Sequence, residues 1–217
     1  MSQYSKEQDK VLDSIEWNGD EIPRVTGMTA QQLASNSTMT IWQCVIQLND
    51  GKSAIQRDVI KHKPVVIMLV STNREDGERF LVTREYRAGV DMVAIGFPAG
   101  CIEDGEDPRH AAHRELREET GIEVTEDTLY EISTPLGITS SENMTDELAH
   151  LYRIKLHQFT IVGQDLDDDE RIQYAWISWD QLLQLVETGL IRDSREINLI
   201  YDEKINRLQT QLVNLTL

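Results

Sequence analysis

Three glutamates close together in the sequence offer the clearest chemistry in this chain. Glu115, Glu118 and Glu119 stand at i, i+3 and i+4, a spacing that places all three carboxylates on one face of a helix. Like charges on one helix face repel one another, so something positive has to offset them. A hard divalent cation takes carboxylate oxygens and keeps waters for a substrate phosphate. The spacing indicates a Mg²⁺ site, with Mn²⁺ as an alternative, although a short acidic run by itself is more often a solvated helix face.

The helix that would carry these glutamates has clear limits. Asp107 is a typical N-cap residue, and Pro108 suits the first helical position. Gly121 is a typical residue at which a helix ends. Ala112 and Leu116 mark the face that packs. We expect a helix of about three turns between these limits.

The spacing around this helix is more specific than the glutamates alone. It runs Gly100, five residues, Glu106, seven residues, then Arg114-Glu115-Leu116-x-Glu118-Glu119-x-Gly121-Ile122. Every position matches the Nudix box, so the sequence resembles the Nudix hydrolases. Members of that family cleave a nucleoside diphosphate linked to another group. The resemblance implies an α/β/α sandwich around a mixed β-sheet.

The resemblance also implies a set of metal ligands. Glu115 and Glu119 would be the main ligands, with Glu118 joining or supporting them. The carbonyl group of Ala99 would add a further metal contact. The implied cofactor is therefore Mg²⁺, or Mn²⁺, on the acidic face of the helix.

The implied catalytic residues are Arg114, Glu118 and Glu170. Arg114 would hold a glutamate in place, with Glu106 as the expected partner. Glu170 lies in a second acidic run, "DLDDDERI" at residues 165–172, in a loop where the resemblance implies a general base. Most carboxylates of this run fit a solvated turn. Asp168 and Asp169 are adjacent to Glu170, so the assignment could shift by one or two residues.

The flanks of the box narrow the resemblance to the ADP-ribose pyrophosphatase branch. The matching segments are "GKSAIQRDVIKHKPVVIML", "VTREYR" and "FPAG". By this resemblance Arg57 and Arg87 would contact the substrate, because guanidinium groups suit phosphate and ribose oxygens. Surface or strand-edge salt bridges explain the same two residues equally well.

Two departures from that branch affect the expected site. Gly96 stands where the branch usually has a glutamate, which removes one expected carboxylate from the metal site. The stretch from Pro135 to Glu147 carries extra residues, so this loop could admit a different leaving group. Glu147 is a candidate substrate contact. Glu142 and Asp146 are secondary candidates that fit loop-solvating or capping roles better.

The remaining elements follow from apolar patterns. "PVVIMLVST" predicts a central strand covered on both faces, in a hairpin with "ERFLVTREY". Asn49-Asp50-Gly51 predicts another hairpin turn. "ELAHLYRIKL" and "IQYAWISW" predict strands, and "WDQLLQLVETG" predicts a helix closed by Gly189.

The chain ends in a further predicted helix. Its apolar residues recur at helical spacing, at Ile197, Tyr201, Ile205, Leu208 and Leu212. The fold class is therefore α/β, with an N-terminal β extension over residues 1–60, a Nudix domain over residues 61–217, and this C-terminal helix. The resemblance implies that the extension mediates homodimerisation.

Charge and cysteine usage limit the partners. The 217 residues have a formal net charge of −17, which argues against a nucleic acid or an anionic membrane as partner. No apolar run approaches a membrane span, and the N-terminal segment "MSQYSKEQDKVLDSIEW" contains no apolar h-region of a signal peptide. Cys44 and Cys101 lie far apart without zinc-site spacing, which favours a reducing compartment. We expect a cytoplasmic protein.

The expected reaction is Mg²⁺-assisted hydrolysis of a nucleoside diphosphate sugar. ADP-ribose would give AMP and ribose 5-phosphate. GDP-mannose, a UDP-sugar or another nucleoside diphosphate derivative is the alternative substrate. An alternative of another class is a Nudix domain that senses a nucleotide without cleaving it. Such sensors usually append a DNA-binding module, and the sequence shows no basic helix-turn-helix stretch.

Overall fold

The computed structural model describes residues 6, 10, 14, 15, 25–36, 38–49, 54–133, 137–168 and 170–216. Asp50 and Gly51 of the predicted turn, together with Pro135 and Asp169, lie outside these ranges. The chain divides into two compact units, of which the larger comprises Gln32–Trp42 and Asp58–Leu217. The smaller unit comprises Met1–Gln31 and Gln43–Arg57.

A mixed eight-stranded sheet forms the centre of the larger unit. Its main path has the order β11-β5-β4-β10-β8, and β6, β7 and β9 pair with β5, β4 and β10 respectively. Strands β4 and β10 run parallel, whereas the other pairs are antiparallel. The strands are β4 (Val65–Arg74), β5 (Gly77–Arg87), β6 (Met92–Gly96), β7 (Ala99–Cys101), β8 (Ile122–Glu131), β9 (Ile138–Thr139), β10 (Leu148–Ile161) and β11 (Gln173–Ile177).

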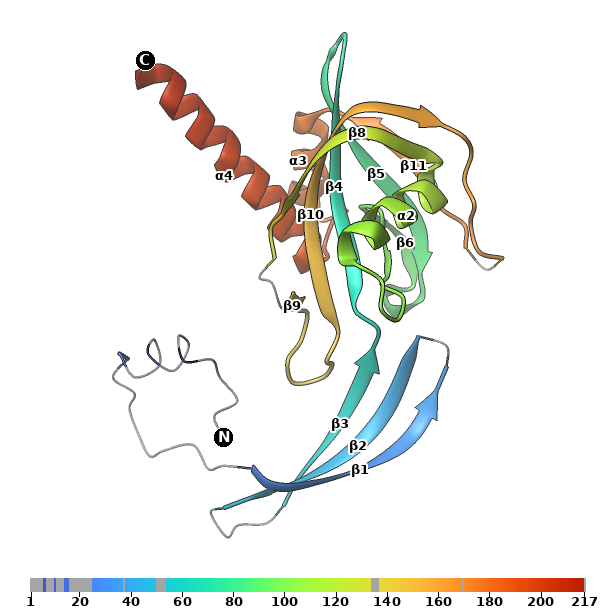
Figure 1. The fold of residues 1–217 in the computed structure, drawn as a ribbon, viewed down its shortest axis with the longest axis vertical. Helices are drawn as coiled ribbons and strands as arrows, with labels where there is room; N and C mark the ends of the chain where they lie inside the picture. Colours follow the sequence, from blue (N-terminus) through green and yellow to red (C-terminus); the bar gives the residue numbers. More distant parts are fainter. Residues whose placement is uncertain are drawn as a thin grey trace. The chain divides into compact units, whose positions relative to one another are not determined.

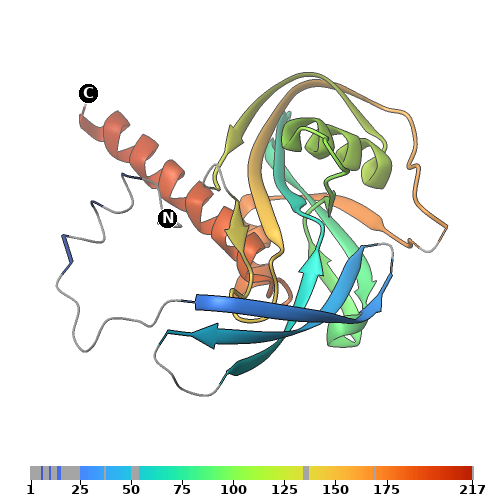
Figure 2. The ribbon, with the colours of Figure 1, turned by 60° about the horizontal axis from the view of Figure 1, so that its bottom comes forward.

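Helices cover both faces of this sheet. Helix α2 (Pro108–Thr120) packs on one face, and helices α3 (Trp179–Glu187) and α4 (Ser194–Thr216) pack on the other (Figures 1 and 2). A short 3-10 helix, η1 (Ala88–Val90), follows β5. The predicted α/β/α sandwich around a mixed sheet is confirmed.

Strand β4 is the central strand that its apolar run predicts. Met68 and Val70 lie in the core cluster under α2, whereas Ile67 and Leu69 lie in the cluster under α3 and α4. Successive side chains of a strand point to opposite faces, so covering both faces requires every position to be apolar. The apolar run of β4 therefore forms part of the core on which helix α2 packs.

A second sheet holds the three N-terminal strands, in the order β1-β2-β3. They are β1 (Val25–Ser35), β2 (Met39–Leu48) and β3 (Ile55–His62). The sequence predicted β-structure on both sides of residues 49–51 but missed β1. Its segment "VTGMTAQQLAS" contains a glycine and two glutamines, and nearly all of its residues are exposed.

The terminal helix is confirmed, but most of its predicted apolar stripe does not form core. Leu199 and Ile200, near the start of α4, are buried against the sheet. Tyr201, Ile205 and Leu208 are all more than half exposed. The 23-residue helix continues beyond the part that contacts β4 and β10. Among the described residues, no helix is both long enough and apolar enough to cross a membrane.

Candidate active site

Helix α2 begins and ends at the residues that the sequence predicts. The Asp107 side chain accepts a hydrogen bond from the backbone N–H of Arg109 at 2.9 Å, and Pro108 follows as the first helical residue. Gly121 ends the helix in the left-handed conformation, with φ of 70°. A side chain there would also collide with Gly163, whose carbonyl carbon lies 2.6 Å from the Cβ position. Two requirements therefore fix a glycine at this end.

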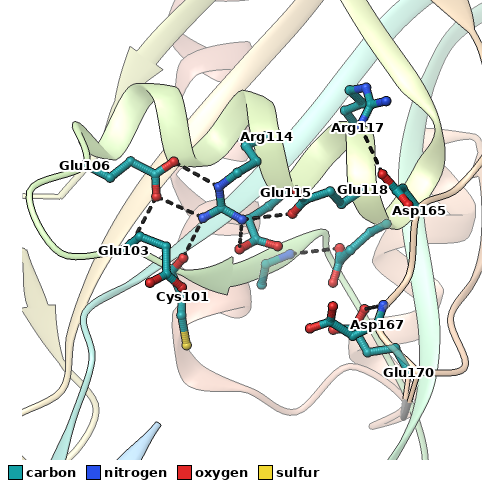
Figure 3. A network of polar contacts seen from close by, with 12 residues as sticks. Cys101, Glu103, Glu106, Arg114, Glu115, Arg117, Glu118, Asp165, Asp167 and Glu170 are labelled. Atoms are coloured by element: carbon teal, nitrogen blue, oxygen red, sulfur yellow. Dashed lines mark hydrogen bonds and ion pairs between the residues drawn. The ribbon is translucent and has the colours of Figure 1, made fainter. Parts of the chain in front are cut away.

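Arg114 is the positive group at the centre of the acidic face. Its guanidinium donates to both oxygens of Glu106 at 2.9 Å, to Glu115 at 2.7 Å and to Glu118 at 2.8 Å (Figure 3). It also donates to the carbonyl oxygen of Cys101 at 2.8 Å. The hydrogen bond from Arg114 lowers the pKa of Glu106. Arg114 therefore offsets part of the repulsion and orients three carboxylates of the box, those of Glu106, Glu115 and Glu118.

Glu115 and Glu119 are costly to keep ionised in this arrangement. Glu119 is only 4% exposed, and it accepts a hydrogen bond from the backbone N–H of Ala99 at 3.1 Å. Burial raises its pKa well above the ordinary value. Burial also raises the pKa of Glu115 to about 7, against the opposing effect of Arg114. A cation between these side chains would relieve that cost.

Gly100 is explained by its contact with the box helix. A Cβ at this position would lie 2.0 Å from the carboxyl carbon of Glu115. Any side chain would therefore push that carboxylate away. Position 100, the first glycine of the box, must therefore lack a side chain so that the Glu115 carboxylate can lie against it.

The loop after β10 docks on the end of α2. The backbone N–H of Val162 donates to the Gly121 carbonyl, and that of Asp165 donates to the Glu118 carbonyl, both at 2.8 Å. These bonds satisfy carbonyl groups at the helix end that have no partner within the helix. They also hold the start of the second acidic run beside the box glutamates.

Glu170 lies close to those glutamates. Its charge contributes to the raised pKa of both Glu115 and Glu119. One of its carboxylate oxygens accepts a hydrogen bond from the backbone N–H of Asp167 at 3.1 Å (Figure 3). The structure thus brings Glu170 to the acidic face of α2.

The donor set suits a hard divalent cation, although its geometry is not preformed. Within the described ranges, no group of three or more His, Cys, Asp or Glu side chains is arranged to hold a metal ion. Arg114 holds Glu115 and Glu118, while Glu119 is bonded to Ala99. Carboxylate and carbonyl oxygens are the ligands that Mg²⁺ prefers. Each of these hydrogen bonds uses one oxygen of its carboxylate, so the other oxygen of each can turn toward a cation while the present partners are kept.

A cavity of about 770 Å³ adjoins this cluster. That volume lies within the range typical of small-molecule sites. Three predicted residues line it, namely Arg87, Ala99 and Glu147. Arg87 forms an ion pair with Glu85 at 3.0 Å and remains largely exposed.

Arg57 belongs to the smaller unit. Its guanidinium donates to the carbonyl oxygen of the neighbouring Gln56 at 2.8 Å. Its role toward the substrate stays a prediction.

The loop candidates separate into different roles. Glu142 is exposed. Asp146 accepts a hydrogen bond from the backbone N–H of His62 at 3.0 Å and so fixes the loop to the end of β3. Glu147 forms an ion pair with Arg195 and lies 3.4 Å from a ring nitrogen of His62.

The sequence analysis missed the charged residues at the start of α4. Arg192, Asp193, Arg195 and Glu196 all line the cavity. Glu196 accepts a hydrogen bond from the backbone N–H of Phe97 at 3.1 Å, and burial raises its pKa to about 7. No sequence motif identifies these four residues as part of a site. The one indication in the sequence was the glycine at position 96, where the related enzymes usually have a glutamate.

Comparisons with known proteins agree with this geometry. A family model described as NUDIX domain matches residues 61–197. The methanol dehydrogenase activator of Bacillus methanolicus is 28% identical over 167 residues, which cover 77% of this chain and 85% of that protein. The ADP-ribose pyrophosphatase of Bacillus subtilis (strain 168) is 26% identical over 165 residues, covering 76% and 84% respectively.

A solved structure shares the fold. The crystal structure of an ADP compounds hydrolase covers 90% of this chain and 98% of its own, with a TM-score of 0.62 and 17% identity. Because the family model spans more than half of the 217 residues, the chain belongs to the Nudix hydrolase family.

Proposed function

We propose that this protein hydrolyses the pyrophosphate bond of ADP-ribose, with Mg²⁺ or Mn²⁺ as cofactor, to give AMP and ribose 5-phosphate. The observation that carries the proposal is a cavity lined by arginine side chains and by Ala99 and Gly100, the two residues against which the box glutamates Glu119 and Glu115 lie. A diphosphate needs both, because its charge is offset by guanidinium groups and by a cation. The similarity to an ADP-ribose pyrophosphatase supports this choice of substrate.

The box supplies the cation site in this proposal. Glu115, Glu119 and the carbonyl group of Ala99 hold the cation, and Glu118 joins or supports them. The bound cation would stabilise the negative charge of the diphosphate during cleavage. Arg114 keeps Glu115 and Glu118 oriented, since it donates to both.

Glu170 is the proposed general base. It accepts a proton from the attacking water, whose oxygen forms a new bond to phosphorus while the bridging P–O bond breaks. Its place beside Glu115 and Glu119 supports this role. Arg57, Arg87 and Glu147 are the proposed substrate contacts.

A substrate panel tests the proposal. Purified protein with Mg²⁺ is assayed against ADP-ribose, GDP-mannose, a UDP-sugar and ATP, with product identification. We expect AMP from ADP-ribose at the highest kcat/KM. Preferred cleavage of GDP-mannose or a UDP-sugar would select the alternative substrate. Tight binding of ADP-ribose without any product would instead favour a nucleotide sensor.

We further propose a cytoplasmic homodimer that uses residues 1–60 at its interface and binds no nucleic acid. Three exposed apolar side chains on β1, Val25, Met28 and Leu33, support the interface. The net charge of −17 supports the exclusion of nucleic acid. Light scattering of the full chain should give the mass of two copies. Met28→Glu should reduce that mass at low concentration.

A further inference from the structure

The space above Gly96 is filled by a side chain from another element. A Cβ at this position would lie 2.1 Å from the Oε1 atom of Glu196 and 3.0 Å from its carboxyl carbon. Gly96 does not have a positive φ, so its backbone does not demand glycine. The glycine is therefore explained by the carboxylate that α4 inserts there.

The Glu196 carboxylate has one oxygen committed and one available. Oε1 accepts the hydrogen bond from the backbone N–H of Phe97 at 3.1 Å. Oε2 accepts no hydrogen bond from any described residue. The side chain is only partly exposed and lines the cavity. An acceptor held in such a place is suited to receive a donor from a molecule in the cavity.

Glu196 also contacts the backbone segment of residues 97–99, which helix α2 contacts through Glu119. The Phe97 N–H binds Glu196, and two residues later the Ala99 N–H binds Glu119 at 3.1 Å. Between them, the Pro98 carbonyl accepts a hydrogen bond from the backbone N–H of Met68 at 3.0 Å. These hydrogen bonds fix the position of residues 97–99. Glu196 and the box residue Glu119 therefore bind the same short backbone segment.

The chemistry of the cavity indicates what Glu196 can bind. A carboxylate repels phosphate oxygens, which the nearby side chains of Arg87 and Arg192 can take. A carboxylate accepts hydrogen bonds from hydroxyl or amino groups. Outside its phosphates, a nucleoside diphosphate sugar carries such donors on its sugars and on some bases.

Building on the proposed function, we propose that Glu196 is a substrate-binding residue, whose carboxylate reaches the site from α4 through the space that Gly96 leaves open. Its Oε2 atom accepts a hydrogen bond from a hydroxyl or amino group of the nucleoside diphosphate sugar. The residue thereby contributes to the choice of substrate rather than to the cleavage step.

Kinetics of Glu196→Gln provide the first test. The amide oxygen can still accept the hydrogen bond from Phe97, so the fold should persist, while an amide NH₂ group replaces the second acceptor oxygen, Oε2. We expect KM for ADP-ribose to rise about 10-fold to 100-fold, with kcat within a few-fold of the wild type. Mg²⁺ affinity, measured by calorimetry without substrate, should not change. Asn198→Ala, an exposed change two residues further along α4, is the matched control.

A transfer of the carboxylate provides the second test. Gly96→Asp alone should clash with Glu196 and lower the Tm. Glu196→Ala alone should raise KM at least as much as Glu196→Gln. The double variant Gly96→Asp/Glu196→Ala restores a carboxylate to the same space, so we expect its KM to recover most of the loss. An unchanged KM in both single Glu196 variants would overturn the proposal, as would a folded double variant no better than Glu196→Ala.

Substrate analogues identify the donor. ADP-ribose is compared with IDP-ribose, which lacks the amino group of the base, and with an analogue lacking a hydroxyl on the terminal ribose. The effect of Glu196→Gln should vanish for the analogue without the partner group. An equal effect on all three, or a change in Mg²⁺ affinity, would contradict direct substrate binding. If the wild type cleaves a different nucleotide sugar, the proposed function fails, and the same variants still test Glu196 on that substrate.

Discussion

Helices α2 and α4 both bring glutamates to the candidate site, but the sequence encodes them in different ways. On α2, Glu115 and Glu119 are one turn apart, and their positive partner Arg114 is in the same helix. Glu196 on α4 follows Gly96 by 100 residues in the sequence. It reaches the site only because the fold brings the two residues together. The local spacing of α2 tolerates little change. The α4 side depends on packing between distant segments of the chain, so no local spacing reveals it.

The largest expected effect concerns Glu170, which belongs to neither helix. Glu170→Gln should lower kcat about 10²-fold to 10⁴-fold, because a positioned base contributes that range. Affinity for substrate and Mg²⁺ should stay nearly unchanged. Asp168→Asn, an exposed change in the same loop, is the control and should cost less than about tenfold, since salt screens such charges. Near-normal turnover of Glu170→Gln would place the base elsewhere.

The second-largest expected effect is that of removing a metal ligand from α2. Glu119→Gln should fold normally, because the amide oxygen can keep the hydrogen bond from Ala99. Its turnover should fall at least about 100-fold through weaker cation binding. The measurement is kcat across a Mg²⁺ titration, with Glu123→Gln on the exposed edge of β8 as the control. Wild-type activity of Glu119→Gln at limiting Mg²⁺ would remove Glu119 from the metal site.

The two sides differ in how much could be predicted. The limits of α2 followed from Asp107, Pro108 and Gly121, because caps are local signals. Strand β8 was missed because its segment "IEVTEDTLYE" lacks a clean alternation, and its pairing with β10 carries register shifts near Gln158. Glu196 could not be found, since nothing in a linear pattern tells which side chain fills the space above a glycine.

Two glycines of the box sharpen the comparison between catalysis and folding. Gly100→Ala should leave the Tm nearly unchanged but displace Glu115, and a displacement of about 1 Å can cost about 10²-fold in activity. Gly121→Ala should instead lower stability by at least about 1–2 kcal/mol, because its left-handed backbone disfavours a side chain and the added Cβ would collide with the Gly163 backbone. Thermal unfolding and kcat, measured for both variants, separate the two roles. Equal losses of Tm in both would contradict the steric role of Gly100.

The smallest expected effect is on how the folding stability changes with pH. In the absence of metal, this pH dependence comes from the carboxyl groups of Glu115 and Glu119 on α2. The pKa of Glu115 is about 7 and that of Glu119 is well above its ordinary value of 4.5, in both cases mainly because of burial. Such carboxyl groups bind more protons in the folded state than in the unfolded state. Their contribution therefore favours folding at low pH and is lost as the pH rises through the folded pKa.

Mg²⁺ takes both groups as anions, so it should restore the lost stability and release protons on binding. We expect the increase in Tm on replacing a chelator with Mg²⁺ to be larger at about pH 8 than at about pH 5.5, with each kcal/mol giving about 2–4 °C. Glu119→Gln should reduce this pH dependence, whereas Glu196→Gln, on the α4 side, should leave it in place. A Mg²⁺ effect of equal size at both pH values would mean that the raised pKa values of the α2 glutamates are not linked to the cation.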